Sequence, residues 1–202
     1  MIKAVIFDYG GVISDGGAGI EVTSRLASNL AISKVRATEL WDLVWSNFMK
    51  GKIDEDELWK RVEAAYGKPI NVSHRQVFNT WEHMLPRPEV MELVDQLKNH
   101  GYIVGMLSNV VPPTEAIIRR EGAYQIFKPC ILSCNLGFAK PDQEIYDELL
   151  RQLPGLKPSE ILFIDDNDYC VTPAEAMGIL TIRATDVKQI VSDVKEAIRQ
   201  SS

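Results

Sequence analysis

This chain has no long hydrophobic run, few cysteines and no excess of basic residues among its 202 positions. The apolar stretch nearest the N-terminus covers only residues 4–7, which is too short for a signal peptide. No run approaches the ~20 apolar residues of a membrane-spanning helix. We therefore expect a cytoplasmic protein that has no membrane partner.

The charge balance argues against a nucleic-acid partner. The formal net charge is −6, and the pair Arg119-Arg120 is too short to form a basic patch. The cysteines, Cys130, Cys134 and Cys170, lack the paired spacing of a metal site, so we expect them to be reduced and packed. The composition leaves a monomer and a homodimer equally open.

Hydrophobic runs alternate with helical patterns along most of the chain. Strands are expected at residues 2–7, 102–107, 129–133, 161–164 and 179–182. Helices are expected at residues 88–99, 112–121, 142–152, 172–177 and 186–199. Strands that alternate with helices indicate right-handed βαβ units and a parallel sheet. The pattern predicts an α/β fold with a doubly wound, Rossmann-like sheet.

A helical segment, residues 16–85, interrupts this alternation after the first strand. It predicts a small helical domain inserted into an α/β core domain made of residues 1–15 and 86–202. The segment begins with a glycine-rich stretch, residues 16–19, and two prolines, Pro86 and Pro88, follow it, which suits a hinged lid.

Two helix starts inside the helical segment are expected from capping-box-like pairs, Asp54 with Glu57 and Ser73 with Gln76. The segment also holds every tryptophan of the chain, and we expect these to form its core, with one or two facing Asp8. The tryptophans are Trp41, Trp45, Trp59 and Trp81.

Polar side chains follow three of the expected strands. Asp8 follows the first strand, Ser108-Asn109 the second and Asp165-Asp166 the fourth, while Lys140 precedes a proline and a helix. Open α/β sheets bind ligands at the carboxyl ends of their strands. A carboxylate there can attack phosphorus or bind Mg²⁺, although Asp8 alone is equally typical of a turn.

The adjacent carboxylates Asp165 and Asp166 strengthen the case for a metal. Two carboxylates crowded at the end of a buried strand repel each other unless a cation is present. Backbone N–H groups of Tyr9 and Gly10 could form an anion-binding nest in the turn after the first strand. Lys140 would add a compact positive charge for phosphate oxygens or for Asp8.

The order Asp8, Ser108, Lys140, Asp165-Asp166 resembles the haloacid dehalogenase (HAD) superfamily of hydrolases over nearly the whole chain. The resemblance implies that residues 16–85 are a helical cap. It implies a catalytic pair, Asp8 and Lys140. It implies phosphate binding by Tyr9, Gly10, Ser108, Asn109 and Lys140. It implies a Mg²⁺ site made by Asp8, the Gly10 carbonyl, Asp165 and Asp166, with Asp166 as the direct ligand of the acidic pair.

The chain departs from most HAD phosphatases at Gly10, where they carry a second Asp that acts as general acid and base. An Asp-x-Gly segment is similar to that of the sugar-phosphate phosphatases of the glucose-1-phosphatase type. Asp15 is a weak candidate for the missing role. Tyr169-Cys170 also replaces a polar pair that orients the acidic loop in relatives.

We therefore expect a Mg²⁺-dependent phosphatase that hydrolyses a small soluble phosphate monoester, such as a sugar phosphate, through an aspartyl-phosphate intermediate on Asp8. Two alternatives stay open. A 2-haloacid dehalogenase would use the same Asp8 without a metal, but Asp165 and Asp166 would repel its carboxylate substrate. A catalytically weak phosphate-binding or regulatory protein would explain Gly10.

Overall fold

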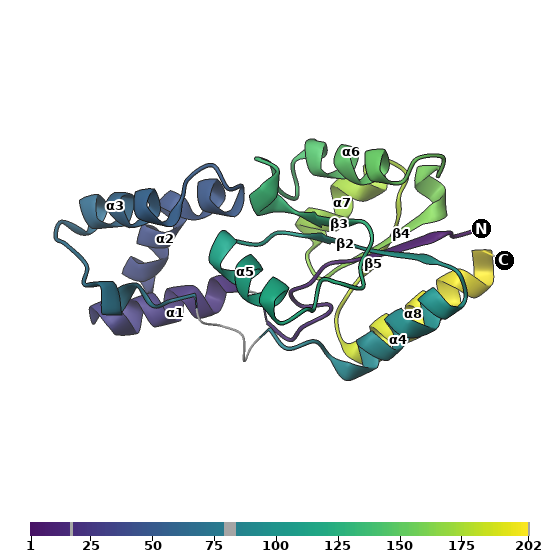
Figure 1. Cartoon of the computed structure of the whole chain (residues 1–202), viewed down its shortest axis with the longest axis horizontal. Helices are drawn as coiled ribbons and strands as arrows, with labels where there is room; N and C mark the ends of the chain where they lie inside the picture. The colour runs from purple at the N-terminus through teal and green to yellow at the C-terminus, as the bar shows by residue number, and fades with distance from the viewer. Residues whose placement is uncertain (17, 79–83, 202) are drawn as a thin grey trace.

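The computed structural model describes residues 1–16, 18–78 and 84–201. A parallel five-stranded sheet with the strand order β3-β2-β1-β4-β5 lies at its centre (Figure 1). Its strands are β1 (Ala4–Phe7), β2 (Ile103–Ser108), β3 (Cys130–Leu132), β4 (Ile161–Asp165) and β5 (Leu180–Arg183). The predicted α/β class and the doubly wound parallel sheet are confirmed.

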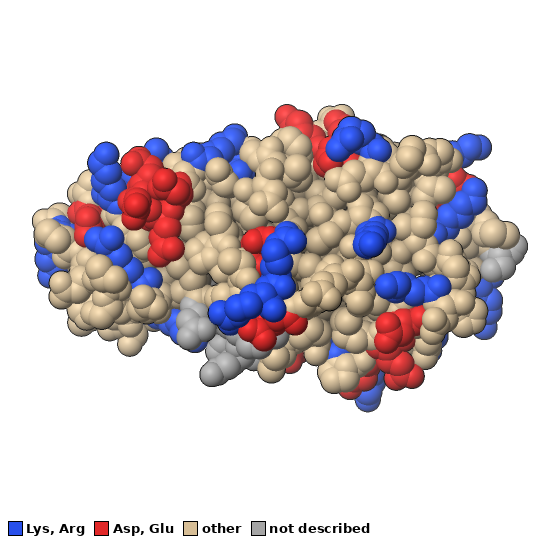
Figure 2. Space-filling model, in the orientation of Figure 1, with Lys and Arg blue, Asp and Glu red and all other residues tan. Residues whose placement is uncertain are grey.

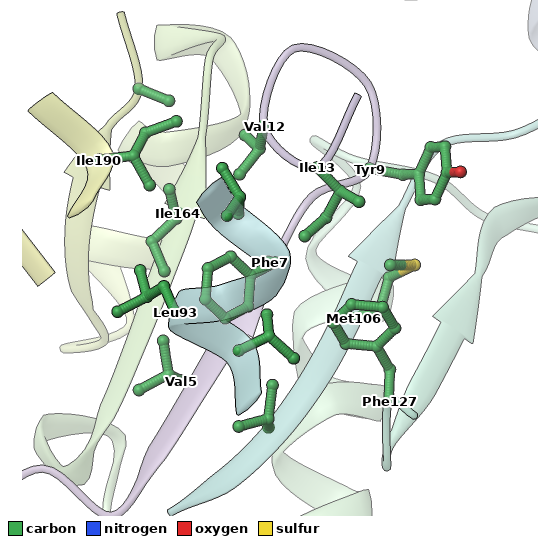
Figure 3. Close-up of a cluster of buried hydrophobic side chains, with 14 of the residues drawn as sticks. Val5, Phe7, Tyr9, Val12, Ile13, Leu93, Met106, Phe127, Ile164 and Ile190 are labelled. Atoms are coloured by element: carbon green, nitrogen blue, oxygen red, sulfur yellow. The ribbon is translucent and has the colours of Figure 1, made fainter. Parts of the chain in front are cut away.

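Helices cover both faces of the sheet (Figure 1). The helices on one face are α4 (Pro88–Asn99), α5 (Pro112–Arg120) and α8 (Val187–Ser201), and those on the other are α6 (Gln143–Gln152) and α7 (Asp168–Ala176). Side chains alternate between the faces because the strand repeat is two residues. Val5 and Phe7 pack with Leu93 and Ile190 of α4 and α8 (Figure 3), whereas Ile6 packs on the α6 side.

The inserted segment forms a helical lobe at the end of the molecule away from both chain termini (Figure 1). Its helices are α1 (Ala18–Leu30), α2 (Lys34–Met49), α3 (Glu55–Tyr66) and the 3₁₀ turn η1 (Val72–Arg75). The lobe has a hydrophobic cluster of its own, which includes Trp41, Phe48 and Trp59. Gly17 of the expected hinge and Trp81 lie outside the described residues, and the domain boundaries at 15/16 and 85/86 stay a prediction.

One of the two expected helix starts in the lobe is confirmed and the other is wrong. Asp54 caps α3, and its side chain accepts a hydrogen bond from Glu57 N at 2.8 Å. Ser73 starts no helix, because it lies inside η1 and the following Val77 is drawn into the hydrophobic cluster of the lobe. In the core domain, α7 begins earlier than the expected residue 172, since Asn167 caps it.

Two chain segments join the lobe to the core domain, and Arg87 holds them together. Ser14 forms bridges with both Gly10 and Pro86. The Arg87 guanidinium donates to the Gly11 carbonyl at 2.9 Å and pairs with Asp15 at 2.7 Å. These contacts therefore fix the two connecting segments where they join the core domain.

Acidic and basic side chains are interspersed over the face of the molecule that is seen in Figure 2. Within the described ranges, no helix has the length and apolar character that crossing a membrane requires.

Candidate active site

The register of the sheet brings the predicted residues of three strands to one edge. Phe7 of β1 is level with Met106 of β2 and with Ile164 of β4. Asp8 follows directly and donates its N–H to the Ile164 carbonyl at 2.9 Å. The strand ends therefore place Asp8 between Ser108 and Asp165.

Lys140 is the buried cation of this edge. Its Nζ lies 3.0 Å from Asp8 Oδ1 and 2.5 Å from Asp165 Oδ2, and only 3% of the residue is exposed. Burial alone would lower the pKa of the Lys140 ammonium, but the Asp8 and Asp165 carboxylates outweigh it and raise that pKa above its ordinary value. Lys140 is therefore charged, and it orients both carboxylates.

Asn109 holds the loop that carries Lys140. The Asn109 amide donates to the Lys140 carbonyl at 2.8 Å and accepts from the Lys140 N–H at 2.9 Å. This reciprocal pair ties the end of β2 to the segment before α6. The Asn109 side chain is thus a positioning group, and the phosphate contact predicted for its backbone N–H stays a prediction.

The two carboxylates of the acidic pair, Asp165 and Asp166, have different surroundings. Asp165 is 1% exposed, and its oxygens accept from Lys140 Nζ and, at 2.9 Å, from Asn167 N. Asp166 is solvent-accessible, and its pKa is raised by partial burial and then by the nearby Asp165 charge. Asp166 therefore has a carboxylate open to an external ligand.

Gly11 makes room for Asp166. A Cβ atom on Gly11 would lie 2.2 Å from Asp166 Oδ2, and the backbone there has φ +76°. A side chain at this position would therefore have to displace Asp166 and would also strain the backbone.

Asp8, Asp165 and Asp166 fit a hard divalent cation. Each offers an oxygen, and the three oxygens all lie within 4.8 Å of one another. Carboxylate oxygens are the ligands that Mg²⁺ prefers. The Gly10 carbonyl, which the sequence adds to this set, stays a predicted ligand.

The nucleophile candidate has a perturbed acidity. Burial raises the pKa of Asp8 to about 6, with a further increase from Asp165, while Lys140 and a hydrogen bond with Ser108 lower it. A cation next to Asp8 would favour the ionised form. The Ser108 hydroxyl thus lies within reach of Asp8, as the sequence predicts for a phosphate-binding group.

A cavity of about 170 Å³ opens beside these groups. Its catalytic end is lined by Asp8, Gly10, Ser108, Asn109 and Asp166. Trp45 of α2 also lines it, which confirms that a tryptophan of the lobe faces Asp8, whereas Trp41 and Trp59 are buried in the lobe.

Several expected residues have other surroundings in the structure. The Tyr9 hydroxyl donates to the Met84 carbonyl at 2.7 Å and points away from Phe7 (Figure 3). The phosphate contact predicted for Tyr9 therefore concerns its backbone N–H. Asp15 pairs with Arg87 and its side chain is 87% exposed. Asp15 is also not among the described residues that line the cavity.

Two residues that contact the acidic pair have roles that sequence reasoning missed. Arg183, the last residue of β5, donates to the Asp166 carbonyl at 2.9 Å and pairs with Asp168. Asn167 supplies the N–H for Asp165, which is the orienting contact that Tyr169-Cys170 put in doubt. The position of Arg183 at a strand end was the available signal.

Burial raises the pKa of the Cys170 thiol to about 12, so it stays protonated.

The family of this chain follows from comparison with known proteins. Residues 2–178 match the model of the haloacid dehalogenase-like hydrolases, so the chain belongs to this family of hydrolases.

Individual relatives are distant but similar along their whole length. The chain is 25% identical to the sesquiterpene phosphatase astK of Aspergillus oryzae, over 97% of this chain and 96% of the relative. It is 22% identical to the (S)-2-haloacid dehalogenase 4A of Burkholderia cepacia, over 90% of this chain and 82% of the relative.

Solved structures of the same fold cover nearly all of the chain. A HAD-like hydrolase of Porphyromonas gingivalis has a TM-score of 0.80 at 25% identity and covers 98% of both chains. A HAD family enzyme of Bacteroides thetaiotaomicron, solved with magnesium and inorganic phosphate, has a TM-score of 0.72 at 23% identity and covers 92% of this chain and 96% of its own.

Proposed function

We propose that the protein is a Mg²⁺-dependent phosphatase that hydrolyses small phosphate monoesters through an aspartyl phosphate on Asp8. One observation carries the proposal. The Asp8 carboxylate lies beside the buried Lys140 cation and within 4.8 Å of the free carboxylate of Asp166, at the end of a cavity.

The reaction needs a nucleophile in line with the leaving group and compensation of the phosphoryl charge, because phosphate monoesters hydrolyse very slowly unaided. An Asp8 oxygen attacks phosphorus, the P–O bond to the alcohol breaks, and the leaving alkoxide takes a proton from solvent water. Water then cleaves the acyl phosphate, which restores the Asp8 carboxylate and releases inorganic phosphate. Lys140 holds Asp8 in position through its 3.0 Å ion pair.

A Mg²⁺ ion held by Asp8, Asp165 and Asp166 would neutralise charge on the phosphoryl oxygens. The Ser108 hydroxyl and the N–H groups of Tyr9, Gly10 and Asn109 are the proposed donors to the same oxygens. The magnesium and phosphate in the Bacteroides thetaiotaomicron enzyme support this assignment at the level of the shared fold.

A 2-haloacid dehalogenase activity is the competing proposal, since one relative carries that name. The acidic cluster disfavours it. A haloacid carries its own carboxylate, and Asp166 would place a second negative charge next to it with no compensating metal in that reaction. The sesquiterpene phosphatase relative supports a phosphate ester instead.

The test is turnover of p-nitrophenyl phosphate by protein treated with a chelator, with and without added Mg²⁺. We expect turnover only with Mg²⁺, and a loss of roughly 10⁴-fold or more in kcat for Asp8→Asn, as for removal of other nucleophiles. Asp15→Asn is the matched control, because Asp15 pairs with Arg87 outside the cavity lining. Metal-independent release of halide from 2-chloropropionate would establish the dehalogenase instead.

A further inference from the structure

Apart from the polar residues of the catalytic end, the described lining of the cavity is mostly apolar and aromatic. Its walls come from Trp45 and Met84, from Val110 and Val111 after β2, from helix α5, and from two tyrosine rings. The α5 side chains are Thr114 and Ile118, and the rings are those of Tyr9 and Tyr124. Most of this wall therefore belongs to the core domain.

The three hydroxyl groups on this wall do not face the cavity. The Tyr9 hydroxyl is bonded to the Met84 carbonyl, and the two aromatic rings pack edge to face at 5.5 Å. The hydroxyl oxygens of Thr114 and Tyr124 are shielded from solvent and have no hydrogen-bond partner. What these side chains present to the cavity is therefore carbon.

Charged side chains of the described lining are confined to the catalytic end, where they are Asp8 and Asp166. A second cavity shares Trp45 and Asn109 with the first, but Asp8 is not among its described lining residues. Its two described cations already have partners: Lys50 pairs with Asp142 at 2.6 Å, and Lys140 pairs with Asp8 and Asp165. An ester whose phosphorus faces Asp8 lies in the first cavity, whose other lining residues are mostly apolar and aromatic.

The chemistry of this wall selects among alcohols. A hydroxyl that leaves water for an apolar wall without a new partner weakens binding, whereas each buried methylene strengthens it. A sugar carries several hydroxyls, and the unpartnered hydroxyls of Thr114 and Tyr124 are shielded from solvent rather than exposed to them.

We propose that this wall binds the leaving group, and that the substrate is a phosphate monoester of a compact, uncharged and largely apolar alcohol. Ile118, which is buried, and the Tyr124 ring shape this wall, and they belong to the core domain rather than to the lobe. This proposal rests on the phosphatase function proposed above, and it disfavours the sugar phosphates that the sequence resemblance suggests.

The first experiment compares esters of different alcohols with the unmodified protein and Mg²⁺. The apolar esters are benzyl phosphate and 3-methylbutyl phosphate. The polar esters are glucose 1-phosphate, ribose 5-phosphate and glycerol 3-phosphate, and p-nitrophenyl phosphate reports general phosphatase activity. We expect kcat/KM for the apolar esters to exceed that for the polar ones by at least tenfold. A preference for a sugar phosphate would overturn the inference while leaving the phosphatase function intact.

The second experiment places a larger side chain in the wall. Ile118→Phe should lower kcat/KM for benzyl phosphate roughly tenfold and change turnover of acetyl phosphate little, since the acetyl group is small. Ile117→Phe, on the same helix but outside the described lining, is the matched control. Circular dichroism and thermal melts establish that both variants fold. Equal losses for the two substrates in folded Ile118→Phe would overturn the role of Ile118.

If Ile118→Phe does not fold, the comparison of esters with the unmodified protein still decides the substrate class. Absence of turnover with every ester, p-nitrophenyl phosphate included, would instead overturn the phosphatase function. The two failures are therefore distinguishable.

Discussion

The edge of the sheet and the helical lobe meet at one cavity, but they are built on different principles. At the edge, the buried cation Lys140 contacts two carboxylates, and Asn109 fixes its backbone on both sides. The lobe has an apolar interior, and its helices contribute Trp45 to the described cavity lining. The edge is held by specific polar contacts, whereas the lobe is held mainly by its own hydrophobic packing.

Among the described residues, few polar contacts join the C-terminal end of α2 to the core domain. Lys50 pairs with Asp142, and the Ser133 hydroxyl donates to the Met49 carbonyl at 2.7 Å. The residues proposed for catalysis therefore lie at the sheet edge, and the lobe that covers them is stabilised separately. Substitutions at the sheet edge should therefore have large effects on activity, and those at the lobe contacts small ones.

The largest expected effect distinguishes the two members of the acidic pair. Asp166→Ala should lower activity at limiting Mg²⁺ by about 10³-fold, since metal stabilisation of transition-state charge is worth several kcal/mol. Asp165→Ala should instead destabilise the fold by about 3 kcal/mol, because it removes a partner of the buried Lys140. Mg²⁺ titrations of activity and urea unfolding of both variants test this separation. A metal requirement unchanged in both would refute the metal site.

The next effect tests what the sheet edge lacks. Gly10→Asp should accelerate esters with poor leaving groups by roughly 10²-fold, within the range of general acid catalysis. It should change p-nitrophenyl phosphate hydrolysis little, because p-nitrophenolate leaves without a proton. The measurement is kcat/KM for p-nitrophenyl and benzyl phosphate in both proteins. Equal changes for the two esters would mean that the general acid is not missing at residue 10.

A smaller effect is expected where the backbone makes room for Asp166. Gly11→Ala should raise the Mg²⁺ concentration for half-maximal activity by about 10-fold, a size typical of changes that disturb metal ligands indirectly. Gly155→Ala is the matched control, since it also has positive φ but no atom within 4 Å of the added Cβ. If both variants shift the Mg²⁺ requirement equally, backbone strain rather than the clash with Asp166 is responsible.

The smallest effect belongs to the lobe contact. Lys50→Met removes a partly exposed ion pair worth about 0.2–1 kcal/mol, so KM should rise by no more than about fivefold while kcat stays close to the original value. Lys60→Met removes an exposed lysine elsewhere on the lobe and should change neither. A large fall in kcat for Lys50→Met would break the distinction between a chemical edge and a covering lobe.

The sequence predicted the sheet and the gathering of Asp8, Ser108 and Asp165, because strand ends in a parallel sheet meet at one edge. It left open whether Lys140 serves the phosphate or Asp8, since that depends on the path of the loop before α6. The 3.0 Å contact with Asp8 favours the second role.

The cavity wall could not be read from the sequence. Thr114, Ile118 and Tyr124 follow the pattern of ordinary core residues, and their place beside Asp8 depends on how α5 packs. The start expected at Ser73 was wrong for a related reason. Burial of Val77 in the lobe overrode a local capping signal.

Gly51, between α2 and α3, lies where the lobe contacts the core domain. A Cβ atom on Gly51 would lie 2.0 Å from the Cys134 carbonyl oxygen, so backbone rests directly on backbone at this point. Gly51 therefore permits a backbone-to-backbone contact between the lobe and the core domain that a side chain would exclude. Any larger residue would hold these two backbones further apart. The absence of a Cβ atom at Gly51 therefore sets how closely the lobe and the core domain approach here.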